Sequence, residues 1–384
     1  MPSRRTVLRS SLAAALLTPS LPRAQTARRV LVIGAGAAGL TAAFHLRRAG
    51  LDVVLLEASN RWGGRLKRLT GLSELPLDLG AEWIHDAPEV LGEIPGTGPS
   101  DMGVATMEYR PETYQFWHQD RLRNFNALRF AYAEVKFRET TWYGFFERFI
   151  YPEATSTIET GAEVVEISDT SDGVSVRLAD GRSITGNHAL VTVPLSVLQR
   201  GKIAFAPALA PPRLEEISNV TFGAGFKVFL KFSQRFYPDM LMFGPRLSGL
   251  EDRWDSKIYY DAMWGKPTAE HVLGLFTVAE GPLDRAGLDD AALIESVLDE
   301  LVGIYGSGVR QAFEAGNVQN WSQTPHIAGS YSMTNNSEYD ISDILAPADN
   351  RLLFAGEALG GEARSTVHGA AFSAIEAVQT ILEA

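Results

Sequence analysis

The chain has 384 residues, which is enough for roughly two to three domains, each with a buried core. With 45% hydrophobic and only 21% charged residues, it is not intrinsically disordered. Its 46 acidic residues outnumber 35 lysines and arginines, and the resulting formal charge of −11 argues against a nucleic acid as the main partner and tolerates a cationic ligand better. The absence of cysteine excludes disulfides, thiolate metal sites, cysteine nucleophiles and thioether-linked cofactors. We assign no metal ligands.

The first residues are predicted to be a signal peptide. Arg4 and Arg5 precede a short apolar run at residues 12–17, and a stretch with two prolines ends at Ala24. The run is too short to span a bilayer, and this order of parts is typical of an export signal. Because the paired arginines resemble a twin-arginine signal, we expect residues 1–24 to direct a folded, cofactor-loaded protein through the twin-arginine export machinery to the periplasm. A disordered basic tail is the alternative.

No later stretch of the sequence reaches the length of a membrane helix, so we expect the mature protein not to be embedded in a membrane.

The next segment reads as a βαβ unit. The continuous apolar run Val30–Ile33 predicts a strand buried on both faces, residues 40–49 have helical character, and Val53–Leu56 predicts a second strand. Gly34, Gly36 and Gly39 stand between the first strand and the helix, at the spacing of a dinucleotide-binding turn. The sequence therefore predicts a site where a pyrophosphate meets a helix N-terminus.

The acidic residue after the second strand narrows the choice of dinucleotide. Glu57 closes that strand and can accept hydrogen bonds from an adenosine ribose, while its charge would repel a 2′-phosphate. This disfavours NADP but does not separate NAD from FAD. The segment Arg61–Arg65, which contains a Gly-Gly-Arg block directly after the ribose-binding acid, favours FAD.

Later elements are predicted with less detail. The segment 86–151 is rich in aromatic residues but weakly periodic, and we assign no elements to it. The Pro-Ala stretch at 206–212 marks a predicted crossing between domains. Strands are expected at 174–178, 189–193, 227–232, 258–264, 272–278 and 352–355, and helices at 291–305 and 367–382.

Several blocks in order resemble the flavin-dependent amine oxidase family, which includes monoamine oxidases, polyamine oxidases and the lysine-specific histone demethylase. The motifs are most similar to those of polyamine oxidases. Besides the βαβ unit and the Gly-Gly-Arg block, the resemblance rests on Leu79–His85, Val191–Leu195, Phe226–Val228, Trp321, Gly329–Ser332, Phe354–Glu357 and Ser365–Ala370.

The resemblance implies an α/β fold with two domains. The first is a Rossmann-like FAD-binding domain of the glutathione-reductase-2 type, discontinuous over residues 28–86, 157–215 and 341–384. The second is a mixed α+β substrate domain over residues 87–156 and 216–340, whose helical part is shortened because the segment after His85 is shorter than is usual in the family.

The resemblance also implies which residues hold FAD. The Val164 backbone would meet the adenine, Glu357 would face the ribityl part, and the Val367 N–H would meet the pyrimidine edge of the flavin, where a helix N-terminus stabilises negative charge. The cofactor would be held without a covalent bond. The implied cofactor-binding residues are Gly34, Gly36, Ala38, Gly39, Glu57, Ala58, Gly64, Arg65, Gly80, Ala81, Glu82, Trp83, Val164, Tyr331, Gly356, Glu357, Thr366 and Val367.

Four residues are implied in the chemistry. Lys227 would be bridged by water to flavin N5, although its alternating strand pattern alone is equally typical of a solvated face. His85 would stand in a substrate tunnel, with a surface histidine as the alternative. Tyr339 and Trp321 would line the pocket near the flavin, whereas aromatic residues at such positions are more often core. Lys231, on the same strand, is interpreted as a surface residue.

The implied reaction is oxidation of a C–N bond of a primary or secondary, polyamine-like amine. Hydride passes from the α-carbon to flavin N5, water hydrolyses the imine, and O2 is reduced to H2O2. An apolar pocket favours the neutral amine, so no strong base is required. Two alternatives stay open: a desaturase or porphyrinogen-type dehydrogenase, and a non-catalytic flavin-binding protein with a truncated substrate domain.

Overall fold

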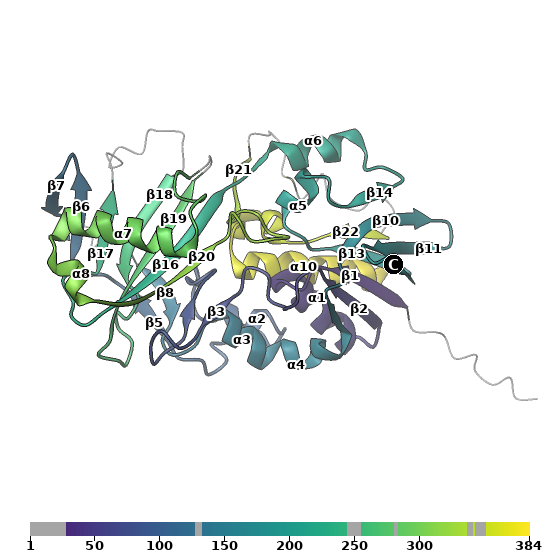
Figure 1. The fold of residues 1–384 in the computed structure, drawn as a ribbon. Helices are drawn as coiled ribbons and strands as arrows, with labels where there is room; N and C mark the ends of the chain where they lie inside the picture. The colour runs from purple at the N-terminus through teal and green to yellow at the C-terminus, as the bar shows by residue number, and fades with distance from the viewer. Residues whose placement is uncertain (1–27, 127–132, 244–254, 280–282, 336–340, 342–350) are drawn as a thin grey trace, which may run out of the picture.

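The computed structural model describes residues 28–384 except 127–132, 244–254, 280–282, 336–340 and 342–350. The chain forms two lobes along one axis (Figure 1). A parallel sheet and the helices α1 and α10 build one lobe, and a seven-stranded sheet builds the other. Among the described residues, no helix combines the length and the apolar character that crossing a bilayer demands.

The first lobe is organised around a five-stranded parallel sheet in the order β22-β13-β1-β2-β9. Apart from Arg29, every residue of β1 is buried, as expected for a strand covered on both faces. The strands are β1 (Arg29–Ile33), β2 (Asp52–Glu57), β9 (Ile158–Thr160), β13 (His188–Val191) and β22 (Leu352–Phe354).

Two different layers cover this sheet. Val30 and Val32 share one core with α1 (Ala37–Arg48) and α10 (Val367–Glu383), which pack against each other through buried alanines. Leu31 and its neighbours on the opposite face share a second core with a four-stranded sheet. That sheet consists of β12 (Ser183–Gly186), β11 (Gly173–Leu178), β10 (Val164–Thr170) and β14 (Ala204–Ala206), in this order.

The second lobe contains a mixed sheet in the order β20-β16-β19-β18-β17-β6-β7. Helix α7 (Asp290–Tyr305) packs on β20 and buries Leu293, Val297, Leu298 and Leu301, which follow its helical period. The strands are β6 (Tyr114–His118), β7 (Arg121–Asn124), β16 (Ala224–Phe232), β17 (Met240–Phe243), β18 (Asp255–Asp261), β19 (His271–Ala279) and β20 (Phe313–Asn320).

The described residues of the segment 86–151, to which we assigned no elements, contain strands and helices that divide between the lobes. β6 pairs in parallel with β17, while β5 (Thr106–Tyr109) and β8 (Glu134–Phe137) form an antiparallel pair beside the cavity described below. The helices α3 (Trp142–Phe149) and α4 (Tyr151–Ala154) pack in the core of the first lobe instead of the second, where we expected residues 87–156. The amphipathic α3 buries Trp142, Phe145 and Phe146, and that apolar face needs the surface beside α1.

The chain passes from the first lobe to the second later than the expected position at residues 206–212. α6 (Pro211–Asn219) still packs in the first lobe through Ile217, and the chain passes to β16 only after β15 (Val220–Phe222). The remaining elements are β3 (Arg68–Leu69), β4 (Leu77–Asp78), α2 (Val90–Glu93), a 3-10 turn at Thr155–Thr157, α5 (Leu195–Gln199), α8 (Gly308–Ala312), β21 (Ser332–Asn335) and 3-10 turns at Glu357–Leu359 and Gly361–Ala363.

Gly39 allows the close packing of the first lobe to be tested, and Gly303 in the second lobe serves as its control. A Cβ atom on Gly39 in α1 would lie 1.9 Å from the Gly34 carbonyl oxygen, whereas a Cβ on the exposed Gly303 in α7 would meet no atom within 4 Å. We therefore expect Gly39→Ala to lower the free energy of unfolding by about 2–4 kcal/mol. The matched Gly303→Ala should raise it by about 0.5–1 kcal/mol, because alanine is the better helix former. Denaturant unfolding of both variants measures this, and equal stabilities would contradict the close helix–strand contact.

Candidate active site

A cavity of about 1410 Å³ lies between the two lobes. It is lined at one end by the β1–α1 turn and at the other by β16, β18 and β19. Pockets for single small ligands typically measure about 300–1,000 Å³, so this cavity has room for a dinucleotide and a second molecule.

The glycine turn forms the floor of the nucleotide end. Gly34 has φ +103°, which favours glycine, and a Cβ on Gly36 would project into open space rather than onto protein atoms. No side chain caps α1, whose N-cap is Gly36. The turn therefore presents a helix N-terminus and an open backbone surface to the cavity, an arrangement suited to a pyrophosphate.

Glu57 occupies the ribose position at the end of β2. Its Oε2 accepts a hydrogen bond from the Ala35 N–H at 2.8 Å, and its Oε1 accepts one from the Ser59 N–H at 2.8 Å. The side chain is buried but lines the cavity. Since each carboxylate oxygen has a further lone pair, Glu57 can still accept from ribose hydroxyls.

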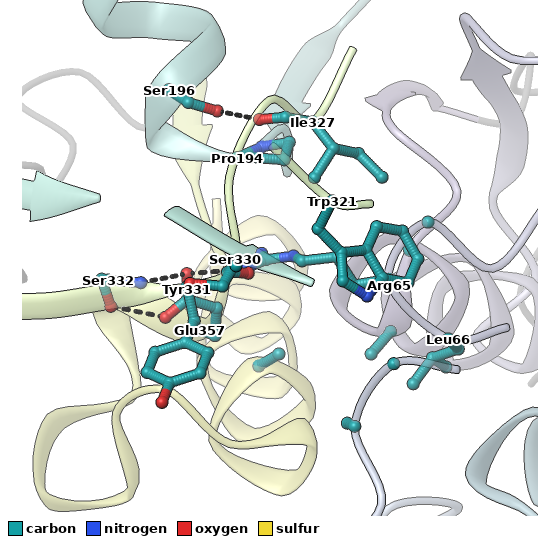
Figure 2. Close-up of a pocket in the computed structure, with 18 of the residues that line it drawn as sticks. Arg65, Leu66, Pro194, Ser196, Trp321, Ile327, Ser330, Tyr331, Ser332 and Glu357 are labelled. Carbon is teal, nitrogen blue, oxygen red and sulfur yellow. Dashed lines mark hydrogen bonds and ion pairs between the residues drawn. The ribbon is translucent and has the colours of Figure 1, made fainter. Parts of the chain in front are cut away.

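Arg65 and Glu357 contact the segment that follows β20, beside the cavity (Figure 2). Arg65 Nη1 donates to the Ser330 carbonyl at 2.8 Å and to Glu357 Oε1 at 3.0 Å. Glu357 also accepts from the Ser332 N–H at 3.1 Å and from the Ser332 hydroxyl at 2.5 Å. These contacts hold Arg65, Glu357 and residues 330–332 together in the wall of the cavity.

The N-terminus of α10 faces the same space. The Thr366 hydroxyl caps this helix by accepting from the Gly369 N–H at 2.9 Å, and both Thr366 and Val367 line the cavity. A Cβ on Gly369 would lie 2.0 Å from the Ala363 carbonyl oxygen, so only glycine allows this tight entry into the helix. Together with the open glycine turn and Glu57, this third feature fits FAD: a pyrophosphate cradle, a ribose acceptor and a helix N-terminus for the flavin.

Lys227 stands at the reactive end, on β16. Its side chain is only 2% exposed, and its Nζ donates to the Asp78 carbonyl at 3.0 Å and to Glu82 Oε2 at 2.8 Å. An ammonium has three donors, and these contacts use two of them. Lys227 also lines the cavity, and one donor of its ammonium is left without a partner among these contacts.

Glu82 sits between two lysines. Its Oε1 pairs with Lys136 Nζ at 2.5 Å, its Oε2 pairs with Lys227, and the Tyr260 hydroxyl donates to the same Oε2. Burial by itself would raise the pKa of the Glu82 carboxyl, but the attraction and hydrogen bonds of Lys136 and Lys227 outweigh burial and hold that pKa well below its usual range. Glu82 is therefore an anion inside the protein.

Burial and the charges of Glu82 and Lys136 also shift the pKa values of three neighbouring side chains. Burial and the Glu82 charge raise the pKa of Asp78 well above its ordinary value, which favours the neutral form of this carboxyl. Burial and then the Lys136 charge lower the pKa of Lys266 to about 8. Burial and Glu82 also raise the pKa of the Tyr260 phenol, which thus stays a donor.

The substrate end of the cavity is largely apolar. Trp321 is buried, and its Nε1–H donates to the Leu79 carbonyl at 2.9 Å, which places the ring under Gly80. The Trp83 Nε1–H and the Tyr114 hydroxyl, both on cavity-lining residues, are buried without a hydrogen-bond partner among the described residues. Further lining residues here are Phe226, Met240, Met242, Ile258, Phe276 and Val278.

The other expected residues lie in different surroundings. His85 is exposed at the rim with φ +56°, and its Nδ1 lies 3.1 Å from Glu134 Oε1. Tyr331 lines the cavity, and burial followed by the Glu357 charge raises its pKa to about 12. Tyr339 lies outside the described residues. In the described part of the chain, no group of three or more His, Asp or Glu side chains could hold a metal ion.

The cavity collects almost all of the residues expected from the sequence. All those within the described ranges line it except Gly39, which instead packs α1 against β1. Lys136 and Tyr260 were missed. The one available signal was Glu82 itself, since an acid inside an otherwise apolar block demands a buried cation.

Comparisons with known proteins identify the family of the chain. Residues 143–382 match the family described as flavin containing amine oxidoreductase, and residues 32–92 match the NAD(P)-binding Rossmann-like domain. The chain is 26% identical to lysine-specific histone demethylase 1B of Mus musculus, over 94% of this chain and 54% of that protein. It is 24% identical to polyamine oxidase 3 of Oryza sativa subsp. japonica, over 88% of this chain and 86% of that protein.

A solved structure supports the fold. Cyclohexylamine oxidase from Brevibacterium oxydans IH-35A superposes with a TM-score of 0.74 at 16% identity, over 93% of this chain and 99% of that one. The chain spans about half the length of the histone demethylases that it matches. Because the match at residues 143–382 covers more than half of the sequence, the chain belongs to the family of flavin-containing amine oxidoreductases, whose cofactor FAD this cavity fits.

Proposed function

We propose that the protein is an FAD-dependent amine oxidase that oxidises a C–N bond of a primary or secondary amine and reduces O2 to H2O2. The observation that carries this proposal is the buried Lys227 ammonium, which stands where the nucleotide-binding cavity opens into an apolar compartment. Family membership and the similarity to polyamine oxidase 3 and cyclohexylamine oxidase support the same reaction class.

FAD, when bound, supplies the hydride acceptor at N5 and the route of electrons to O2. The chain's own residues prepare the reactants for that chemistry. We propose that the remaining N–H of Lys227, whose other two donors are engaged by Asp78 and Glu82, holds a water molecule in a fixed place in the cavity. The apolar walls, among them Phe226 and Phe276, exclude bulk water and disfavour the charged ammonium form of the amine. An amine bound in its neutral form needs no general base.

We propose a polyamine-like alkylamine as the substrate. The alkyl chain would lie against the apolar side chains of β16–β19, and an aromatic residue such as Trp83 offers a face to a cationic group. Glu134, whose side chain is 22% exposed at the rim, is a carboxylate to which a second ammonium of the same substrate would be attracted.

The alternatives are less well supported. A non-catalytic flavin-binding protein would not need a substrate compartment, yet the short segment after His85 supplies Tyr114 to the wall of one. A desaturase or porphyrinogen-type dehydrogenase would share the glycine turn and Arg65. It would not account for a lysine held by Glu82 at the reactive end.

Loss of the Lys227 ammonium tests the catalytic proposal. With an alkylamine as substrate, the native protein should bleach its flavin anaerobically and form H2O2 in air. Lys227→Met should lower turnover about ten- to a hundredfold, since one positioned donor at the reacting centre is lost. Lys231→Met on the same strand removes a charge paired with Glu270 at 2.6 Å outside the cavity, and turnover should stay near the native value. Equal loss in both variants would contradict a specific role for Lys227.

The pH dependence of flavin reduction tests the neutral-amine proposal. Alkylamines resemble the lysine side chain, which titrates near pH ~10 in water. The apolar compartment lowers the pKa of the bound amine, so the stopped-flow rate of anaerobic reduction should rise with pH below that pKa and then level off. A rate independent of pH throughout the range below the amine's solution pKa would refute this proposal.

Export stays a prediction, because residues 1–27 lie outside the described residues. We propose that Arg4 and Arg5 direct the folded protein to the periplasm. Fractionation of bacterial cells should find the flavoprotein in the periplasm, and replacing both arginines by lysine should retain it in the cytoplasm. Unchanged periplasmic recovery of the double variant would contradict a twin-arginine signal.

A further inference from the structure

Lys136 is the most deeply buried cation near the active site, with only 1% of its side chain exposed. It lies on β8 behind Glu82, and it is absent from the described lining of the cavity, which Glu82 and Lys227 reach. Its Nζ lies 4.6 Å from the ring centroid of Tyr109 and 5.1 Å from that of Tyr260. Aromatic faces stabilise a desolvated cation, so this position is built to hold a charge.

The charges of the cluster do not cancel. The ammonium groups of Lys136 and Lys227 both contact the single carboxylate of Glu82. Asp78 meets Lys227 through its backbone carbonyl, and burial followed by the Glu82 charge raises the pKa of its carboxyl, which disfavours a second anion here. One positive charge is therefore in excess. Burial lowers the pKa of the neighbouring Lys266, and the Lys136 charge lowers it further.

Without Lys136, the buried Glu82 carboxylate would cancel the positive charge of Lys227. The pair of Lys227 and Glu82 alone is neutral, and its field in the cavity would be that of a dipole. Lys136 neutralises Glu82 from the far side at 2.5 Å, so the Lys227 charge is left uncompensated toward the cavity.

We propose that Lys136 is a positioning residue that acts through Glu82: it allows Glu82 to hold the Lys227 side chain in place while leaving a net positive charge beside the bound flavin. This inference rests on the proposed function, because it assumes FAD in this cavity. A merely structural role would require Lys136 only as the counter-ion that lets Glu82 be buried.

Sulfite is the probe that separates the two roles. This small anion binds to oxidised flavin in many flavoproteins and bleaches the visible absorbance, so its dissociation constant reports the charge beside the ring without any turnover. Lys136→Met should weaken sulfite binding about tenfold, the effect of a unit charge over about 10 Å at an effective dielectric constant near 20. Lys136→Arg keeps the charge and should stay within about threefold of the native protein.

A double variant restores the charge without restoring the ion pair. Lys136→Met combined with Glu82→Gln removes one cation and one anion, so its sulfite affinity should recover to within about threefold of native. Glu82→Gln alone removes an anion and so adds a net positive charge, which should tighten sulfite binding by about tenfold. If Lys136→Met does not fold, the sulfite affinities of Glu82→Gln and the double variant are compared instead, since these two proteins also differ only at Lys136.

The results distinguish this inference from the proposed function. A native protein that binds no FAD, or that shows no amine-dependent bleaching, refutes the proposed function. If the native protein binds FAD and oxidises an amine, the inference is overturned by sulfite affinities that do not follow net charge. Examples are Lys136→Met within about twofold of native, or the double variant as weak as the single one. Lys231→Met, which removes a half-exposed cation from the same strand as Lys227, serves as control and should bind sulfite like the native protein.

Discussion

A carboxylate that is buried away from water must be neutralised by cations at contact distance. The Glu82 carboxylate therefore brings together three parts of the chain that are distant in sequence. It belongs to the loop after β4, and its partners come from β8 in the short segment after His85 and from β16 in the second lobe. Removing either lysine would leave Glu82 with a single cationic partner. The return of residues 133–137 to the cavity and the inward direction of Lys227 are both consequences of this requirement.

Buried ion pairs seldom add net stability, since the cost of desolvation offsets the attraction between the charges. An apolar cluster of similar volume would support the fold at least as well. The retention of Glu82 and Lys227 at the wall of the cavity, with Lys136 and the Tyr260 phenol behind them, is better explained by the chemistry of that cavity. Its nucleotide end uses backbone groups and Glu57, its substrate end uses apolar walls, and the charged cluster lies between them.

Local sequence was sufficient for the elements whose signal lies within about twenty residues. The βαβ unit at residues 29–57, the amphipathic α7 and the final helix α10 agree with the predicted ranges to within a few residues. Their periodicity, glycine turn and capping residues are all local.

What the sequence could not specify was the choice of partners. β6 contains no signal for pairing with β17, more than a hundred residues later, and α3 could have packed on either lobe until its apolar face met the first one. Glu82 indicated that a buried cation was needed, but spacing alone could not select Lys136. The exposed position of His85 likewise depends on the partner strand β8, which carries Glu134.

The central claim is that FAD lies in the cavity with its ring between the start of α10 and β16. A crystal structure of the yellow holoprotein tests this most directly. The account predicts that the Lys227 Nζ lies about 4.5–5.5 Å from flavin N5, the span of two hydrogen bonds that meet at one water, with the salt bridge to Glu82 intact. A flavin ring placed elsewhere, or a Lys227 side chain turned away from N5, would contradict it.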